Sequence, residues 1–290
     1  MGLALSALLT GCGATTSVGE SGATSSSSSS ADPELLEELA RLPGVVDVTT
    51  SGDSGVGSST TVVMGATATQ DEVVAAGIAA GDEAAERQWQ GEIILARENL
   101  KPFDVEQDIS LPAPWSLPVF PLPTESVEDT LRDLVAIEAM GGTAGAGITN
   151  GWPSVGIERI EDFPALFEQI SGTAVFADGG DYFLINNDHL RIVHVPKRTT
   201  DAAVLEIIAI ATEYPNAEVL LQAPTAGPQW PMLYIARLTT EEASALDARL
   251  RDPKLATADQ EGYPVEYALT ATGEQGAVYT AGTLGNVPKG

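Results

Sequence analysis

The sequence predicts an α+β protein in which a disordered N-terminal tether precedes two compact sandwich domains. Three observations support this prediction. The 290 residues are 43% hydrophobic and 19% charged, which is sufficient to form a buried core. Apolar residues recur at helical spacing in some segments and alternate in others, so helices and strands both occur. Two stretches of biased composition, residues 12–31 and 101–124, divide the chain into units.

The first folded domain is predicted to begin at Asp32-Pro33, an N-cap followed by proline at the first helical position. The leucines of 34–42 lie on one helical face, and Pro43-Gly44 ends this helix. Thr69 and Glu72 have the spacing of a capping box that opens a second helix. Strands are predicted at 45–48, 60–64 and 92–96. The order helix, strand, strand, helix, strand is similar to a small ferredoxin-like sandwich.

The following segment, 101–124, contains six prolines and cannot form a helix. It is predicted to be an interdomain linker, or an extended strap that packs on the surface through Trp115 and Phe120.

The larger domain is predicted to open with a helix from Ser126 to Met140, and its most apolar helix spans 200–214. A hairpin is expected over Gly273-Glu274-Gln275-Gly276. The remaining elements are a short helix at 163–170 and strands at 155–160, 173–176, 182–185, 191–195, 218–221, 263–270 and 277–280. Two ferredoxin-like or related domains are therefore expected.

A weak internal repeat relates residues 60–80, 190–210 and 231–250. Each copy contains a strand, a threonine-rich cap with an acidic residue, and a helix; Asp71 of the first aligns with Asp201 of the second. Because threonine and aspartate cap helices in unrelated proteins, an ordinary strand–cap–helix junction also explains the pattern.

The chain is strongly acidic, with 41 Asp and Glu, 14 Lys and Arg, a net charge of −27 and a pI near 4.1. This charge repels phosphate backbones and anionic lipid headgroups, so nucleic-acid binding and attachment through a basic patch are both disfavoured. Two interpretations stay open, namely solubility and attraction of a cationic partner.

The only cysteine, Cys12, follows the short apolar run 3–9. Leu9-Thr10-Gly11-Cys12 resembles the lipobox of bacterial lipoproteins. The resemblance implies that a signal peptide is removed before Cys12, whose thiol carries the lipid, with palmitate among the acyl chains. No Lys or Arg precedes the apolar run, so the basic part of the signal peptide is expected to be truncated. The Ser-rich tether that follows would span about 25 Å.

The predicted organisation is as follows: signal peptide 1–11, lipidated cysteine and tether 12–31, small α/β sandwich 32–100, linker 101–124, and larger α+β domain 125–290. The expected location is the extracytoplasmic face of the cell membrane. The predicted function is that of a non-enzymatic binding or envelope-assembly module with an envelope protein as its partner. The alternative is a solute-binding lipoprotein of a transporter.

No catalytic residue, cofactor or metal site is predicted. No serine lies in a Gly-x-Ser-x-Gly elbow, and Cys12 is assigned to the lipid. His189 and His194 are five apart, so on one strand they would face opposite sides and could not readily share a metal. The stretch LPGVVDVTT resembles the scaffold of heavy-metal-associated and BON-like domains, but the Cys-x-x-Cys loop of the metal-binding members is missing.

Three further patterns have both a functional and an ordinary interpretation. The acids Asp178, Asp181 and Asp188, with Asn186 and Asn187, could bind calcium, although such residues are also common in turns. The glycine-rich segment 141–147 could cradle a phosphate, but a helix C-cap and loop is the preferred interpretation. Three tryptophans next to prolines could line a groove for a peptide or sugar, or could pack in a core: Trp115, Trp152 and Trp230.

Overall fold

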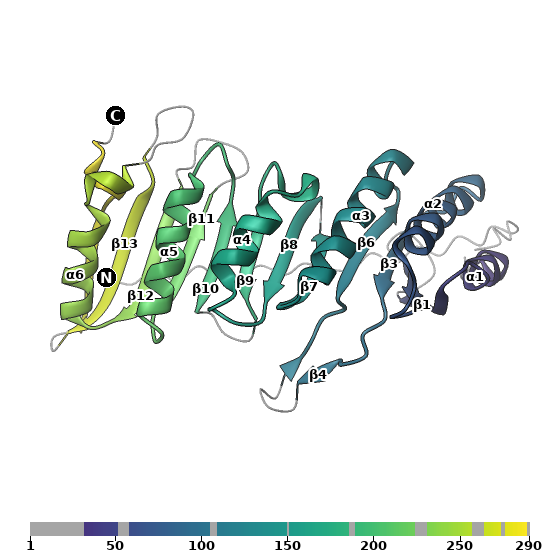
Figure 1. The fold of residues 1–290 in the computed structure, drawn as a ribbon, viewed down its shortest axis with the longest axis horizontal. Coiled ribbons are helices and arrows are strands. Elements are labelled where there is room, and N and C mark those ends of the chain that lie inside the picture. The colour runs from purple at the N-terminus through teal and green to yellow at the C-terminus, as the bar shows by residue number, and fades with distance from the viewer. Residues whose placement is uncertain are drawn as a thin grey trace, which may run out of the picture.

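The structure is a computed structural model that describes residues 32–51, 58–104, 109–149, 151–185, 189–223, 231–256, 264–273 and 276–288. Within these residues, 12 strands form one mixed sheet, and the helices cover only one of its faces (Figure 1). The protein is therefore mixed α/β, in agreement with the predicted class. The predicted signal peptide, Cys12 and tether lie outside the described residues.

The strands of the sheet are β1 (Val45–Ser51), β2 (Ser59–Met64), β3 (Glu92–Arg97), β6 (Trp115–Phe120), β7 (Thr143–Thr149), β8 (Trp152–Ile157), β9 (Gly180–Leu184), β10 (Leu190–His194), β11 (Glu218–Gln222), β12 (Met232–Leu238), β13 (Glu266–Gly273) and β14 (Gly276–Thr283). A separate hairpin pairs β4 (Phe103–Asp104) with β5 (Ile109–Ser110). The α-helices are α1 (Pro33–Ala40), α2 (Gln70–Glu86), α3 (Thr124–Met140), α4 (Phe163–Ser171), α5 (Asp201–Glu213) and α6 (Thr240–Leu250).

The strands lie side by side in the order in which they occur in the chain. Five helices each connect two neighbouring parallel strands, which gives the units β2–α2–β3, β6–α3–β7, β8–α4–β9, β10–α5–β11 and β12–α6–β13. Successive units meet through antiparallel pairs such as β3 with β6 and β7 with β8. Two ferredoxin-like sandwiches are not confirmed, because the units continue one sheet and do not close into separate ones.

This arrangement requires the handedness of the crossovers to alternate. The sheet grows in one direction and the helices stay on one face, but the strand direction reverses from each unit to the next. The crossovers through α3 and α5 therefore have the opposite hand to those through α2, α4 and α6. One of these two sets is left-handed, which is the rare hand for such connections.

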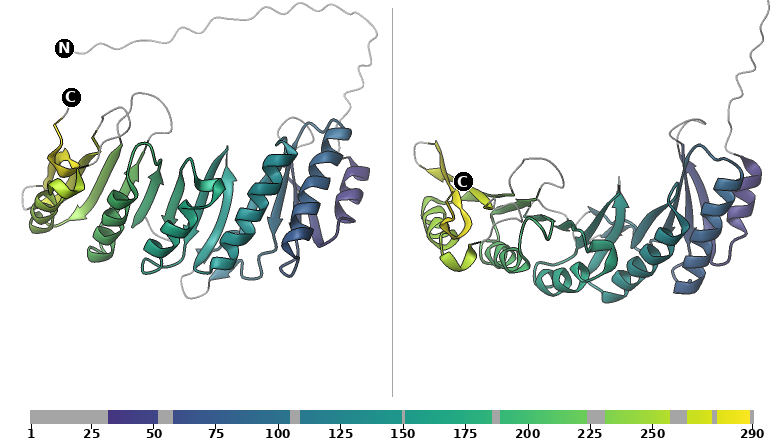
Figure 2. Two further views of the ribbon diagram at one scale, coloured as in Figure 1. Left: turned by 45° about the horizontal axis from the view of Figure 1, so that its top comes forward. Right: turned by 90° about the horizontal axis from the view of Figure 1, so that it is seen from above.

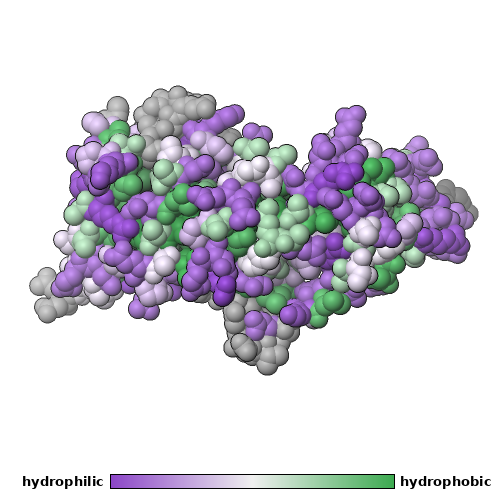
Figure 3. All heavy atoms as spheres, in the orientation of Figure 1, coloured by the Kyte–Doolittle hydropathy of each residue, from purple (hydrophilic) through white to green (hydrophobic). Residues whose placement is uncertain are grey.

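The core lies between the helices and the sheet. Strand side chains that face the helices are buried from β2 to β13, and they include Val62, Leu95, Leu117, Val155, Tyr182, Ile192, Leu221, Leu233 and Tyr267. The sheet is bent into an arc with the helices on its convex side (Figure 2). Figure 3 shows the helix-bearing side, where hydrophilic side chains are interspersed with apolar ones. We call the opposite, helix-free side of the sheet the concave face.

The predicted strand–threonine–helix pattern is confirmed in the structure. Thr69, Thr200 and Thr239 are the N-caps of α2, α5 and α6. Each threonine hydroxyl accepts a backbone N–H three residues later at 3.2–3.3 Å. The units built around α3 and α4 have the same architecture without a threonine cap, so the pattern did not reveal them.

The prediction of a linker at 101–124 is wrong for its second half, because β6 pairs with β3 on one side and β7 on the other. Trp115, Leu117 and Val119 alternate into the core. Pro118 is tolerated because it lies opposite an irregularity in the ladder with β3, where the regular pattern of hydrogen bonds is already interrupted.

Three other predicted elements are corrected. The glycine-rich segment 141–147 is mostly β7, where a Cβ at Gly145 would approach the Ala113 carbonyl oxygen to 2.7 Å, so backbone approach accounts for glycine here. The predicted strand at 173–176 is a 3₁₀ turn, Ala174–Phe176. Helix α3 begins at Thr124, with Pro123 at its N-cap and no side-chain cap from Ser126.

Candidate functional site

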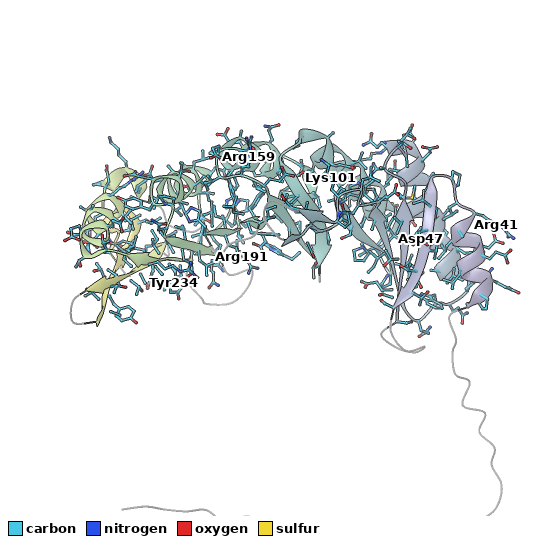
Figure 4. The ribbon with its side chains drawn as sticks, turned by 90° about the horizontal axis from the view of Figure 1, so that it is seen from below. Arg41, Asp47, Lys101, Arg159, Arg191 and Tyr234 are labelled. Atoms are coloured by element: carbon cyan, nitrogen blue, oxygen red, sulfur yellow. The ribbon has the colours of Figure 1, made fainter. Side chains whose placement is uncertain are left out.

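The middle of the concave face holds a charged pair on neighbouring strands. Asp181 of β9 and Arg191 of β10 point away from the helices, because the intervening Tyr182 and Ile192 point into the core. Arg191 Nε lies 3.1 Å from both carboxylate oxygens of Asp181, and Nη2 lies 2.6 Å from Oδ2. Figure 4 shows Arg191 and Tyr234 on the side opposite the helices. The guanidinium of Arg191 is thus held at Nε and Nη2 by Asp181 and lies on the concave face.

This pair is asymmetric in its exposure. The Asp181 side chain is 11% exposed and that of Arg191 is 59% exposed. The hydrogen bond to Asp181 raises the pKa of Arg191, so its positive charge is permanent. The buried carboxylate holds the guanidinium in place, and the remaining N–H groups of Arg191 point toward solvent, where they can bind a carboxylate or a backbone carbonyl.

A pocket of about 310 Å³ opens where β8, β9 and β10 lie side by side, next to the start of β8, the start of β9 and the end of β10. It is lined by Trp152, Ala177, Asp178, Val195, Pro196 and Lys197. Trp152 and Pro196 provide an apolar wall, and Asp178 and Lys197 provide one charge of each sign. Two other hollows, of about 420 and 640 Å³, are more open to solvent. The lining of the smaller pocket fits a compact molecule that carries both an anionic and a cationic group.

Behind this pocket, on the core side of the sheet, lies a buried polar cluster. His194 Nε2 lies 3.1 Å from the Thr199 carbonyl oxygen and 3.4 Å from Asp201 Oδ1. The ring of Phe167 packs edge-on against both Tyr182 and His194, at centroid distances of 5.0 and 5.2 Å. The cluster is enclosed by α4, α5 and the sheet.

Three polar atoms of this cluster are buried and have no hydrogen-bond partner among the described residues: Tyr182 Oη, His194 Nδ1 and Thr199 Oγ1. Burial lowers the pKa of His194 and raises the pKa of Tyr182, so both side chains are neutral near pH 7. Because His194 Nε2 faces a carbonyl oxygen, it must carry the proton, and Nδ1 is then an unpaired acceptor. Burial in this cluster therefore favours the neutral forms of His194 and Tyr182.

The other candidate residues take structural roles or stay apart. His189 places Nδ1 2.6 Å from the Ala217 carbonyl oxygen and Nε2 2.9 Å from that of Ala211. Trp115 is buried, and its Nε1 donates to Glu138. Within the described residues, no three His, Cys, Asp or Glu side chains are grouped closely enough to hold a metal ion.

The predicted calcium and tryptophan clusters are only partly described. Asp178 lines the pocket, whereas both oxygens of Asp181 are bonded to Arg191. Asn186, Asn187, Asp188 and Trp230 lie outside the described residues. Sequence reasoning missed Arg191, whose partner Asp181 lies on the neighbouring strand, and it missed Lys197, which no local motif marks.

No protein-family model, curated protein or solved structure matches this chain. In the part of the chain that the structure describes, none of the helices is both long enough and apolar enough to cross a bilayer.

Proposed function

We propose that this protein is a lipid-anchored, extracytoplasmic binding module whose concave face docks a protein of the cell envelope. The observation that carries the proposal is a curved 12-stranded sheet, within the described residues, with helices on one side only. Elongated repeat architectures commonly bind partners on their concave surface. The lipobox-like Leu9-Thr10-Gly11-Cys12 supports the anchor.

The ion pair between Asp181 and Arg191 on the concave face favours a binding role over a catalytic one. The carboxylate of Asp181 is saturated by Arg191 and is largely inaccessible, which suits positioning and not proton transfer. The net charge of −27 favours a partner with a basic surface, because long-range attraction would speed its approach. We therefore propose a non-enzymatic role.

The concave face can be tested by photo-crosslinking in intact cells. A photoreactive phenylalanine analogue at Tyr234, which is 42% exposed on this face, should give a discrete adduct with an envelope protein. The matched control places the same analogue at Arg159, which is exposed on the helix side (Figure 4). Equal adducts from both positions, or adducts from Arg159 alone, would contradict docking on the concave face.

The anchor is tested separately by fractionation. The wild-type protein should sediment with membranes, and Cys12→Ser should move to the soluble extracytoplasmic fraction. Ser25→Ala, in the serine run of the tether, is the control and should stay with the membranes. Retention of Cys12→Ser in the membrane fraction at the wild-type level would rule out lipidation as the means of attachment.

The edge pocket favours a second candidate function, that of a solute-binding lipoprotein. Its opposite charges, Asp178 and Lys197, fit a small zwitterion such as an amino acid. An amino-acid panel should then contain a ligand that raises the melting temperature of the wild type and leaves that of Lys197→Ala unchanged. If no member of the panel shifts the wild-type protein, this second function is rejected.

A further inference from the structure

The sheet ends at β14, and no described strand pairs with the outer side of this strand. Its eight residues, Gly-Ala-Val-Tyr-Thr-Ala-Gly-Thr, include no charged residue and no proline. Val278 is 43% exposed and Tyr279 is 75% exposed, so apolar side chains are available on both faces of the strand. Such an edge is a template for pairing with another strand.

The opposite end of the sheet is protected against pairing. The ladder between β1 and β2 is irregular between Val45 and Asp47, and the carboxylate of Asp47 lies on the exposed part of the strand. Helix α1 packs against β1 through the buried Leu35 and Leu39 (Figure 1). Bulges, charges and covering helices are the devices that block edge pairing. The strand β14 itself has no charged residue and no register shift in its ladder with β13. Helix α6 contacts β14, and Arg251 Nη2 donates to the Ala281 carbonyl oxygen at 3.4 Å, so the stretch open to pairing is 276–280.

The charge of the chain is unevenly distributed between these ends. Residues 231–290, which include β12 to β14, carry eight acidic and five basic residues, a formal charge of −3. Residues 1–230 carry 33 acidic and nine basic residues, a formal charge of −24. Two copies that met through their β14 ends would keep their most acidic regions far apart, beyond the screening length of about 8 Å at physiological salt.

We propose that a second copy of this chain pairs with β14, strand against strand in antiparallel orientation, to form a two-fold dimer. The two-fold axis of such a pair is perpendicular to the sheet, so both concave faces open toward the same side and the two copies of α1 lie at the outer ends. The contact is a single strand edge, smaller than the about 1,200–2,000 Å² of a standard interface, so the dimer is weak and depends on concentration.

Sedimentation of the full-length Cys12→Ser chain tests this dimer without its lipid. The average mass should rise with concentration from 30.1 kDa toward twice that value and then level off. Because the copies repel each other, raising the salt from about 0.01 M to about 0.15 M should strengthen association. Tyr279→Lys should abolish it, because a lysine on an edge strand is one of the devices that block strand pairing. Tyr234→Lys, the same substitution at a partly exposed position on the concave face, should not.

A cysteine scan along β14 tests the two-fold geometry of the proposed dimer. Single cysteines placed at positions 277–282 of the Cys12→Ser chain should form a disulfide dimer at only one or two positions, because only residues near the two-fold axis bring their Cα atoms within about 7 Å. The far-UV spectrum and melting temperature of Tyr279→Lys should match the parent chain, since Tyr279 is mostly exposed. The proposal would be overturned if the chain stayed monomeric and none of the cysteine variants formed a disulfide dimer. It would also be overturned if the average mass kept rising with concentration, because unlimited growth indicates that β14 of one copy pairs with β1 of the next.

Discussion

The most informative prediction concerns the buried ion pair between Arg97 of β3 and Glu138 of α3. Arg97 Nε donates to Glu138 Oε2 at 3.0 Å, and Trp115 Nε1 donates to the same oxygen at 2.8 Å. Arg97 Nη1 also donates to the carbonyl oxygens of Gly65 and Ala68, at 2.9 and 3.0 Å. Glu138 and Arg97 together thus join two strands, a helix and the loop after β2.

The expected cost of removing this carboxylate follows from burial. The Arg97 side chain is 4% exposed and that of Glu138 is 28% exposed. Removing one member of a buried pair destabilises by about 3–5 kcal/mol. Because water reaches part of the Glu138 site, we expect the lower end, about 3 kcal/mol, for Glu138→Ala. Glu138→Gln keeps an acceptor oxygen and should lose about half of that.

Urea unfolding, followed by tryptophan fluorescence, measures these differences. A loss of about 3 kcal/mol corresponds to a melting temperature about 6–12 °C lower in a protein of this size. Glu37→Ala is the control, because its ion pair with Arg41 joins side chains that are 65% and 60% exposed and should contribute little. If Glu138→Ala and Glu37→Ala unfold at the same urea concentration, the buried network has no special role.

Three further predictions concern single side chains. Burial lowers the pKa of His194, so below about pH 6.5 the unfolded chain binds more protons than the folded chain. The stability of the wild-type protein should therefore fall as the pH drops below about 6.5. In urea titrations at different pH values, His194→Gln should show a smaller loss. Thr69→Ala removes the cap of α2 and should lower the unfolding free energy by about 1 kcal/mol, whereas Thr69→Ser should restore most of it. A Cβ at Gly77 would approach Leu131 Cδ1 to 2.4 Å, so Gly77→Ala should lower the melting temperature despite its better helix propensity; a rise would mean that α2 and α3 are loosely packed.

Local signals in the sequence predicted most individual elements. The capping box at Thr69 and Glu72, the Asp32-Pro33 start of α1 and the hairpin between β13 and β14 are all confirmed. These signals succeed because backbone groups within a few residues satisfy one another. They fail in β6 and β7, where prolines and glycines are compatible with a strand only because of what the neighbouring strand provides.

The order of the strands could not be predicted in the same way. Two successive strand–helix–strand units that are both right-handed form a ferredoxin-like sandwich, because the second unit packs back against the first. Here alternate crossovers have opposite hands, so each unit extends the sheet instead. Nothing in a single unit's sequence encodes this choice, because it depends on which face the next helix must cover.

The candidate site illustrates the same limit. The sequence marks Asp181 only as an acidic residue near a turn, and its partner Arg191 becomes apparent only when β9 and β10 are aligned in register. Lys197 and Trp152, which line the pocket, are 45 residues apart in the chain and meet only because β8, β9 and β10 are consecutive.

The consecutive order of the strands also determines how the molecule is expected to come apart. Every strand of the 12-stranded sheet pairs only with the strands of that sheet that precede and follow it in the chain, so forming the sheet requires no long loop to close early. Amide exchange should therefore be slowest near β8 and β9 and faster toward β1 and β14, as the ends fray one unit at a time. A partner seated across several units would suppress that fraying, and the strongest protection from exchange would then mark where it binds.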